Sequence, residues 1–152
     1  MARAIGTALP ISFKQSVEIC SFIKNRNVND AKKILQDAAE KKAAISFKRY
    51  NWDLGHKTKI GPGSYPEKAS MELIRLIESA EANAQFKGLN TSNLVIAHIS
   101  AHKAGKAWHF GRKTRRKMKR TSIEIVVEEK KKEAKESQKK QEKPKDSGSE
   151  TK

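Results

Sequence analysis

The residues with the clearest chemical character lie between positions 103 and 120. This stretch holds nine Lys and Arg residues and no Asp or Glu, so more than half of the net charge of +16 is gathered in it. Guanidinium groups pair with phosphates in bidentate fashion, and aromatic rings stack on unpaired bases. The stretch therefore predicts an RNA-binding segment, whose candidate contact residues are Lys103, Lys106, Trp108, His109, Phe110, Arg112, Lys113, Arg115, Arg116, Lys117, Lys119 and Arg120.

A second basic segment, residues 47–63, mixes cations, aromatic rings and glycines. Glycine allows a backbone to approach a phosphate closely. Its rings, Phe47, Tyr50 and Trp52, fit two roles equally well, since they can contact a nucleic acid or close the edge of a small core. We expect the cations of this segment to face RNA, namely Lys48, Arg49, His56, Lys57 and Lys59.

The sequence offers little for catalysis. His98 and His102 would lie on one face of a strand, about 13 Å apart at ~3.3 Å per residue, which is too far for one metal ion. Cys20 lies on the apolar side of a predicted helix, where a cysteine behaves as a small hydrophobe. The sequence also lacks a Gly-rich phosphate loop and clustered carboxylates. We therefore expect a protein that is not an enzyme, with no catalytic residue, no metal site and no cofactor.

The chain's 152 residues suffice for one domain, and its pI near 10.0 indicates a polyanionic partner. No stretch approaches the ~20 apolar residues of a membrane-spanning helix, and the first residues lack the apolar core of a secretion signal. We expect a cytoplasmic protein without a membrane partner that does not form a homo-oligomer. A single cysteine cannot form a disulfide within the chain, so the fold must depend on its apolar core.

Apolar residues recur at helical intervals in three segments. The first begins after Ser12, which is spaced from Gln15 as in a capping box. The second follows Asn29 as its N-cap. The third starts with Pro66 in the first helical position and ends before Gly88, which suits the left-handed residue after a helix. The predicted helices are residues 13–24, 30–39 and 66–87.

Two later segments alternate apolar and polar residues, which predicts strands over 95–102 and 121–128. We expect a short third strand within 3–9, ended by Pro10, which suits the edge of a sheet. Together these elements predict an α+β fold, with three helices packed on a small antiparallel three-stranded sheet. Residues 103–120 would extend two of its strands as a long basic β-hairpin arm. The apolar face of the first of these two strands is predicted to consist of Val95, Ala97, Ile99 and Ala101.

The composition changes after Val127. Residues 128–152 contain nine Lys, seven Asp or Glu, and no aromatic residue, Val, Ile or Leu, so they cannot bury an apolar face. We expect a folded domain over residues 1–127 and a disordered Lys/Glu-rich tail over 128–152. The tail would contribute only +2 of the net charge, so the folded part would carry +14.

Several short motifs occur in the order typical of one protein family. Together they resemble the L-twenty-two family of large-subunit ribosomal proteins over nearly all of residues 1–127, and the segment from Arg49 to His56 resembles an insertion of its archaeal and eukaryotic branch. The motifs are Lys41-Lys-Ala-Ala44 with Phe47-Lys-Arg-Tyr-Asn51, Ser79-Ala-Glu-Ala-Asn-Ala84, Gly88-Leu-Asn90, Ile96-Ala-His-Ile-Ser-Ala-His-Lys103, Phe110-Gly-Arg112 and Thr121-Ser-Ile-Glu-Ile-Val-Val127.

The resemblance implies a structural constituent of the large ribosomal subunit that acts in translation. Its body would sit on large-subunit (23S-type) rRNA beside neighbouring ribosomal proteins, and its arm would line the peptide exit tunnel, with the nascent peptide as a further partner. Gly111 and Arg112 match the family's Gly-Arg pair, but this arm is shorter than the usual archaeal arm and has only Lys106-Ala-Trp-His109 before Phe110. A free-standing RNA- or DNA-binding protein is the alternative, because it would need only the basic arm.

Overall fold

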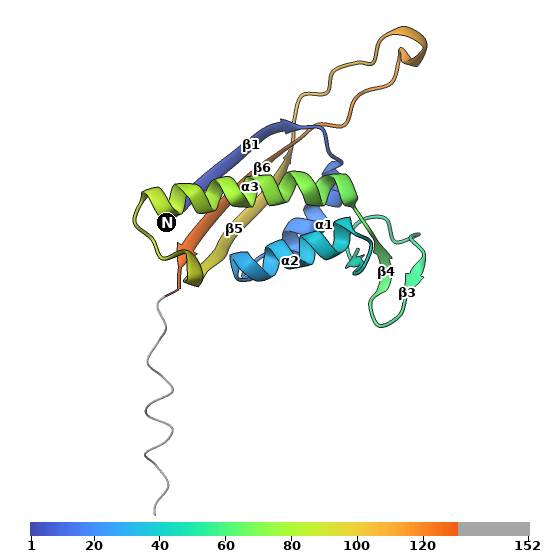
Figure 1. Ribbon diagram of the computed structural model, residues 1–152. Helices are drawn as coiled ribbons and strands as arrows, with labels where there is room; N and C mark the ends of the chain where they lie inside the picture. The colour runs from blue at the N-terminus through green and yellow to red at the C-terminus, as the bar shows by residue number, and fades with distance from the viewer. Residues whose placement is uncertain (131–152) are drawn as a thin grey trace, which may run out of the picture.

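A computed structural model describes residues 1–130 of the chain. It contains three α-helices and two small antiparallel sheets of three strands each, which confirms the α+β class. Figure 1 shows the helices and sheets as one body, from which residues 103–120 project at one end. The elements are β1 (Ala2–Leu9), α1 (Phe13–Ile23), α2 (Val28–Ala39), β2 (Ile45–Ser46), β3 (His56–Lys57), β4 (Gly61–Ser64), α3 (Glu67–Phe86), β5 (Leu94–Lys103) and β6 (Thr121–Glu129), with short 3-10 turns η1 (Thr91–Asn93) and η2 (Gly111–Lys113).

The larger sheet has the strand order β1-β6-β5, and both strand pairs are antiparallel. Its central strand, β6, alternates strictly along its length: Thr121, Ile123, Ile125 and Val127 are buried, and the residues between them are half-buried. The buried side of β6 therefore faces the helices. β1 lies at an edge of the sheet, as predicted.

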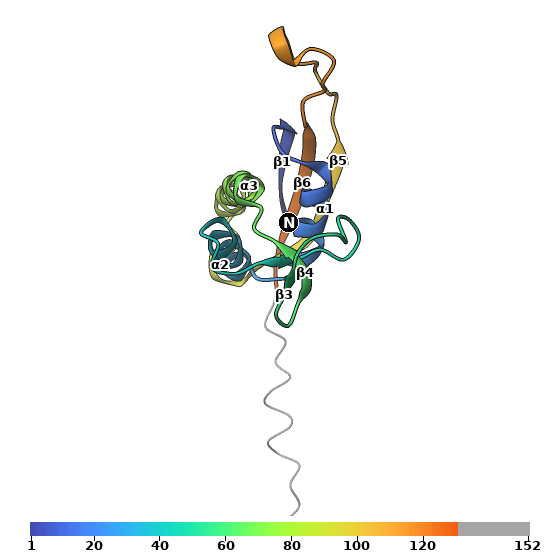
Figure 2. The same cartoon turned by 90° about the vertical axis from the view of Figure 1, so that its right-hand side faces the viewer.

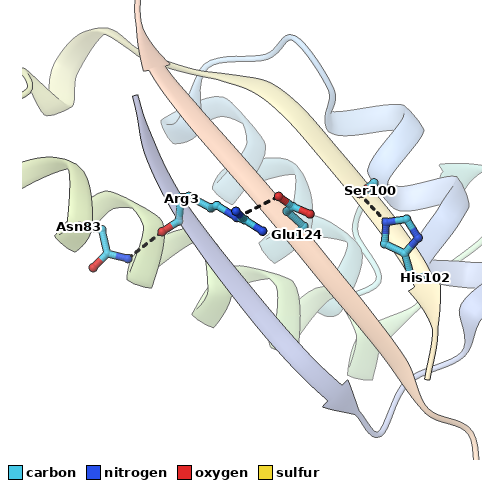
Figure 3. Close-up of polar contacts among 5 residues, drawn as sticks. All are labelled: Arg3, Asn83, Ser100, His102 and Glu124. Atoms are coloured by element: carbon cyan, nitrogen blue, oxygen red, sulfur yellow. Dashed lines mark hydrogen bonds and ion pairs between the residues drawn. The ribbon is translucent and has the colours of Figure 1, made fainter. Parts of the chain in front are cut away.

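Two side chains near the C-terminal end of α3 bind backbone oxygens at the start of β1. Asn83 Nδ2 donates a hydrogen bond to the Arg3 carbonyl oxygen at 2.9 Å (Figure 3), and Lys87 Nζ donates to the Met1 carbonyl oxygen at 3.2 Å. Unpaired backbone groups on an edge strand can recruit a strand from another chain. These two side chains occupy acceptors that would otherwise be open to such pairing.

The prediction of which side chains of β5 face the core is wrong for the first half of the strand. Leu94 and Ile96 are buried, whereas Val95 and Ala97 are only half-buried. A bulge after Ile96 shifts the register against β6 by one residue, and beyond it Ile99 is buried and Ala101 packs against the core, as predicted. The extra residue of a bulge inverts the alternation of buried and exposed side chains beyond it. A prediction that assumes a strict period of two residues cannot detect this inversion.

Two helices cover one face of the larger sheet: α3 packs on β1 and β6, and α1 packs on β5, while α2 lies beside α3 (Figure 2).

α3 begins at Glu67, one residue later than predicted, and Gly88 follows it with a φ of 72°, the predicted left-handed conformation. In α1 the apolar stripe that faces the core is rotated about the helix axis relative to the predicted one. Phe13 and Val17 are only half-buried, whereas Ile19 is completely buried. The stripe predicted for α3 is buried throughout and consists of Ala69, Leu73, Leu76, Ile77, Ala80 and Ala84.

The predicted N-caps of the first two helices need correction. Ser12 is the N-cap of α1, but its side chain makes no capping hydrogen bond, so the capping box is not formed. The N-cap of α2 is Asn27 in place of Asn29, because the helix already begins at Val28, whose side chain is buried in the core.

Residues 45–64 form a second small sheet that the sequence patterns do not predict. Its strand order is β2-β4-β3, and its strands are only two to four residues long, too short to show an alternation. Gly63 lies in the middle of this sheet, where a Cβ atom would come within 3.0 Å of Ile60 Cδ1 and 3.1 Å of Lys57 Cγ. A larger residue at this position would push these side chains apart.

At the other end of the chain, β6 continues to Glu129, two residues beyond Val127. The Lys130 N–H then donates to the Asn93 carbonyl oxygen at 3.1 Å. The prediction of a tail over 128–152 falls mainly on residues 131–152, which lie outside the described residues.

The burial of α3 generates the first testable prediction. Leu73 and Ile77 are fully buried on adjacent turns, so Leu73→Ala and Ile77→Ala should each lower the free energy of unfolding by ~2–5 kcal/mol. Met71 on the same helix is 56% exposed, and Met71→Ala should change it by less than ~0.5 kcal/mol. Urea unfolding followed by circular dichroism measures all three. Equal midpoints for the three variants would contradict this packing of α3.

Candidate nucleic-acid interface

The arm, residues 103–120, is carried by β5 and β6. The pairing of these strands continues into the arm through one more hydrogen bond, from the Ala104 N–H to the Arg120 carbonyl oxygen at 3.3 Å. Farther out, Trp108 and Lys117 form an isolated antiparallel bridge. The arm is therefore a hairpin, as predicted, but its two sides pair at intervals and do not form a continuous ladder.

The tip of the arm is a tight turn. η2 forms it, and the Thr114 N–H donates to the Gly111 carbonyl oxygen at 3.0 Å. Lys117 Nζ lies 4.6 Å from the centre of the Trp108 ring, so this ring makes a cation–π contact within the arm. Phe110, next to the turn, is 84% exposed. The Phe110 ring is thus open for stacking on a base.

The charge of the arm is not compensated by the body. Within residues 1–130, none of the nine cations of the arm forms an ion pair with a carboxylate. Several carboxylates of the body pair with cations of the body itself, for example in the ion pairs Lys32–Glu81 and Lys41–Glu67 (2.8 Å). Like charges at this density repel one another, and a polyanion would relieve this repulsion.

The structure divides the cations predicted between residues 48 and 59 into two groups. Lys48 and Arg49 lie in an exposed turn beside α1, whose Glu18 contacts their backbone. His56 and Lys57 lie on β3, and Lys59 lies in the turn between β3 and β4. Figures 1 and 2 both show the β3–β4 hairpin at the opposite end of the body from the arm. The second group therefore belongs to a separate surface.

A buried carboxylate fixes the first group. Glu18 on α1 is 4% exposed and accepts three backbone hydrogen bonds: Oε2 from Lys48 N at 3.0 Å, and Oε1 from Arg49 N at 2.9 Å and Tyr50 N at 2.7 Å. Burying a charge is costly unless it is hydrogen-bonded, and these three donors satisfy that requirement. Glu18 thus holds the turn in one shape and presents the side chains of Lys48 and Arg49 to solvent.

The three rings of this segment have different roles. Phe47 is 2% exposed and belongs to the core. Trp52 is 73% exposed, and its Nε1 donates to the Arg49 carbonyl oxygen at 2.8 Å. Tyr50 is half-buried, with its ring edge-on to Phe13 at 6.3 Å between centroids. Only Trp52 and Tyr50 therefore remain accessible to a ligand.

The face of the larger sheet turned away from the helices carries several polar side chains (Figure 3). Arg3 Nε and Glu124 Oε1 form an ion pair at 2.9 Å, and Ser100 Oγ lies 3.0 Å from His102 Nε2. His98, which lies on β5 with Ser100 and His102, is exposed. In the part of the chain that the structure describes, no group of three or more His, Cys, Asp or Glu side chains is placed to hold a metal ion.

Cys20 is buried in the core, as predicted. Burial raises the pKa of its thiol to about 12. The thiol is therefore protonated in neutral solution and is a poor nucleophile.

None of the helices within residues 1–130 has the length and apolarity needed to cross a membrane.

The sequence patterns missed two residues of α1 that shape this surface. Glu18 stands between Val17 and Ile19, and nothing in that spacing tells a buried carboxylate from a solvated one. Lys14 lines a groove together with Lys103, although the two are far apart in the sequence. Such a contact follows from tertiary packing alone, so no local pattern could have indicated it.

These features define a small basic α+β protein built around a cationic hairpin. The chain belongs to the ribosomal protein L22p/L17e family, whose model matches residues 4–128. It is 40% identical over 135 residues to the large ribosomal subunit protein uL22 of Archaeoglobus fulgidus, covering 84% of this chain and 87% of the relative. The proteins of the same name from Methanoculleus marisnigri and Thermofilum pendens are 42% identical over 137 residues (85% and 90% covered) and 38% identical over 134 residues (84% and 89% covered). The predicted family and its archaeal-type character are thus confirmed.

The contacts of Glu18 generate the second prediction. In Glu18→Gln the side-chain oxygen can still accept two of the three hydrogen bonds, but the amide nitrogen cannot accept the third. A buried donor left without an acceptor costs ~1–3 kcal/mol, so at least one of the amides of Lys48, Arg49 and Tyr50 should exchange its hydrogen much faster. Hydrogen exchange followed by NMR measures this, with Glu78→Gln on the exposed side of α3 as the control. Unchanged protection of all three amides would show that Glu18 does not hold the turn.

Proposed function

We propose that the protein is a structural, non-enzymatic constituent of the large ribosomal subunit in the cytoplasm, and that it binds large-subunit rRNA. Membership of a ribosomal protein family supports the first part. The rRNA contact rests mainly on one observation: the arm holds nine cations, and none has a carboxylate partner within residues 1–130. A phosphate backbone supplies the missing negative charge.

The body would add two further contact surfaces. Lys48 and Arg49, held by Glu18, would contact RNA beside the arm. The β3–β4 hairpin, with His56, Lys57 and Lys59, would contact a second stretch of RNA at the other end of the body. Contacts of this kind position a protein on RNA without reading its sequence. Neighbouring ribosomal proteins would adjoin the surfaces that RNA leaves open.

We further propose that the arm lines the nascent-peptide exit tunnel, as the family resemblance implies. Its projection from one end of the body supports this role, because a protruding hairpin can insert between RNA segments while the body remains outside (Figure 1). The exposed Phe110 ring near the tip would stack on an unpaired base.

A salt titration tests the RNA contact. Each neutralised phosphate contributes about 0.7–0.9 to the slope of log affinity against log salt. Replacing Arg112, Lys113, Arg115 and Arg116 by Gln should therefore make the slope for binding to deproteinised large-subunit rRNA shallower by about three. Filter binding of the full chain between low and moderate salt gives the slope.

The control variant removes the same charge from the body, by changing Lys33, Lys41, Lys42 and Lys87 to Gln. Two of these lysines already pair with Glu67 and Glu40, so the slope should change much less. Equal changes in both variants would show that net charge, and not the arm, determines RNA binding.

Assembly and tunnel function are tested by deleting residues 106–117 and joining the sides with a short glycine-containing turn. The variant should still enter large subunits, because no buried residue is removed. Its ribosomes should form peptide bonds normally but change the pattern of nascent-chain pausing, which ribosome profiling measures. An unchanged pausing pattern would contradict the tunnel role.

A washing experiment on the unaltered protein tests the alternative function. If the protein leaves large subunits in dilute salt, this would favour a free-standing nucleic-acid-binding protein.

A further inference from the structure

The root of the arm borders a groove of about 460 Å³ that lies between the start of α1 and the two sides of the arm. No Asp or Glu is among the residues that line it. We propose that this groove holds a phosphate of an unpaired RNA segment, with the adjoining base against the rings of Phe13 and Tyr50. The proposal rests on the proposed rRNA-binding function and assigns it a specific anchor. The cations that line the groove are Lys14, Lys103, Lys106, Lys119 and Arg120.

The walls of the groove are fixed relative to each other. Thr121 Oγ1, at the first residue of β6, donates a buried hydrogen bond of 3.0 Å to the Ile11 carbonyl oxygen, just before α1. The hydrogen bond from Ala104 N to the Arg120 carbonyl oxygen closes the arm at the same level. The start of α1 and the arm root therefore form one rigid frame. Cations held in place before binding lose less entropy than cations on a flexible segment.

Two aromatic rings hold two of these cations in place: Phe13, which lines the groove, and Tyr50, which lines the neighbouring hollow. Lys103 Nζ lies 5.5 Å from the centre of the Phe13 ring, and Lys14 Nζ lies 6.0 Å from the centre of the Tyr50 ring. Neither lysine has a carboxylate partner in the described part of the chain. Both ammonium groups are therefore available to an anion that enters the groove.

A second hollow indicates that the anion belongs to a nucleotide. It measures about 340 Å³, shares Phe13 with the first groove, and is also lined by Tyr50, Arg49 and Ile99. Arg49 Cζ lies 5.4 Å from the centre of the Tyr50 ring. Cations beside an aromatic and apolar hollow match a phosphate joined to a base, since bases stack on aromatic rings and guanidinium planes. A peptide of acidic residues alone would use the cations but not the hollow.

The test compares three variants of the full chain by their binding to deproteinised large-subunit rRNA. Loss of two of the cations that surround this phosphate, in Lys14→Gln with Lys103→Gln, should weaken binding about tenfold at physiological salt and flatten the salt slope by about 0.7–0.9, the contribution of one phosphate. Phe13→Leu should weaken binding about fivefold or more at every salt concentration, with an unchanged slope, because stacking is not ionic. The matched control, Lys113→Gln with Arg115→Gln, removes two cations from the tip and should weaken binding less than the root variant. Circular dichroism checks that every variant is folded.

The outcomes separate this proposal from the proposed function. If the unaltered chain binds rRNA with a steep salt slope but the root variant binds as tightly as the tip variant, the groove is not the anchor and the rRNA-binding function stands. If a folded Phe13→Leu variant binds as tightly as the unaltered chain, no base occupies the hollow. Competition by polyglutamate as effective as that by an equal charge of polyuridylate would also overturn the nucleotide assignment. If the unaltered chain shows no salt-dependent rRNA binding, the proposed function itself fails.

Discussion

The antiparallel pairing of β5 with β6 is the interaction on which the rest of the structure depends. The two strands pair from Leu94 and Glu129 at one end to Lys103 and Thr121 at the other. One side of this ribbon supplies the sheet surface that α1 and α3 cover, and its far end becomes the arm. A shift in the pairing by one residue would turn the buried side chains of β6 toward solvent and would also move the arm relative to α1. The core and the basic surface are thus specified by the same register.

The distribution of carboxylates explains how so basic a chain remains folded. In the body, several acids lie beside cations, as in the pairs Arg3–Glu124 and Lys32–Glu81, and Glu18 is held by backbone donors. In the arm there are none. The repulsion that accompanies a high net charge is therefore concentrated in a segment that protrudes from the core. There it opposes compact packing less than it would among the helices.

Most of the fold follows from the sequence, because its longer elements bury one clean face. The stripe of α3 and the alternation of β6 each span several repeats, so single exceptions do not hide them. The sequence did not indicate the bulge after Ile96, the small sheet of residues 45–64 or the rotation of α1, since each depends on contacts between distant segments. The same holds for the site. The cations of the arm are evident from composition, whereas the roles of Lys14 and Glu18 appear only once α1 lies beside the arm root and the turn after β2.

The arm and the body also differ in what holds their residues in place. None of the residues between 104 and 120 is buried, so the arm contributes no fully buried side chain to the core. The body, in contrast, contains every buried residue of the described chain, including the frame that Thr121 and Ile11 build at the arm root. Changes along the arm should thus affect the proposed RNA binding far more than the stability of the fold. The root is the place where the two depend on each other, because a change there alters both the frame and the cations that it holds.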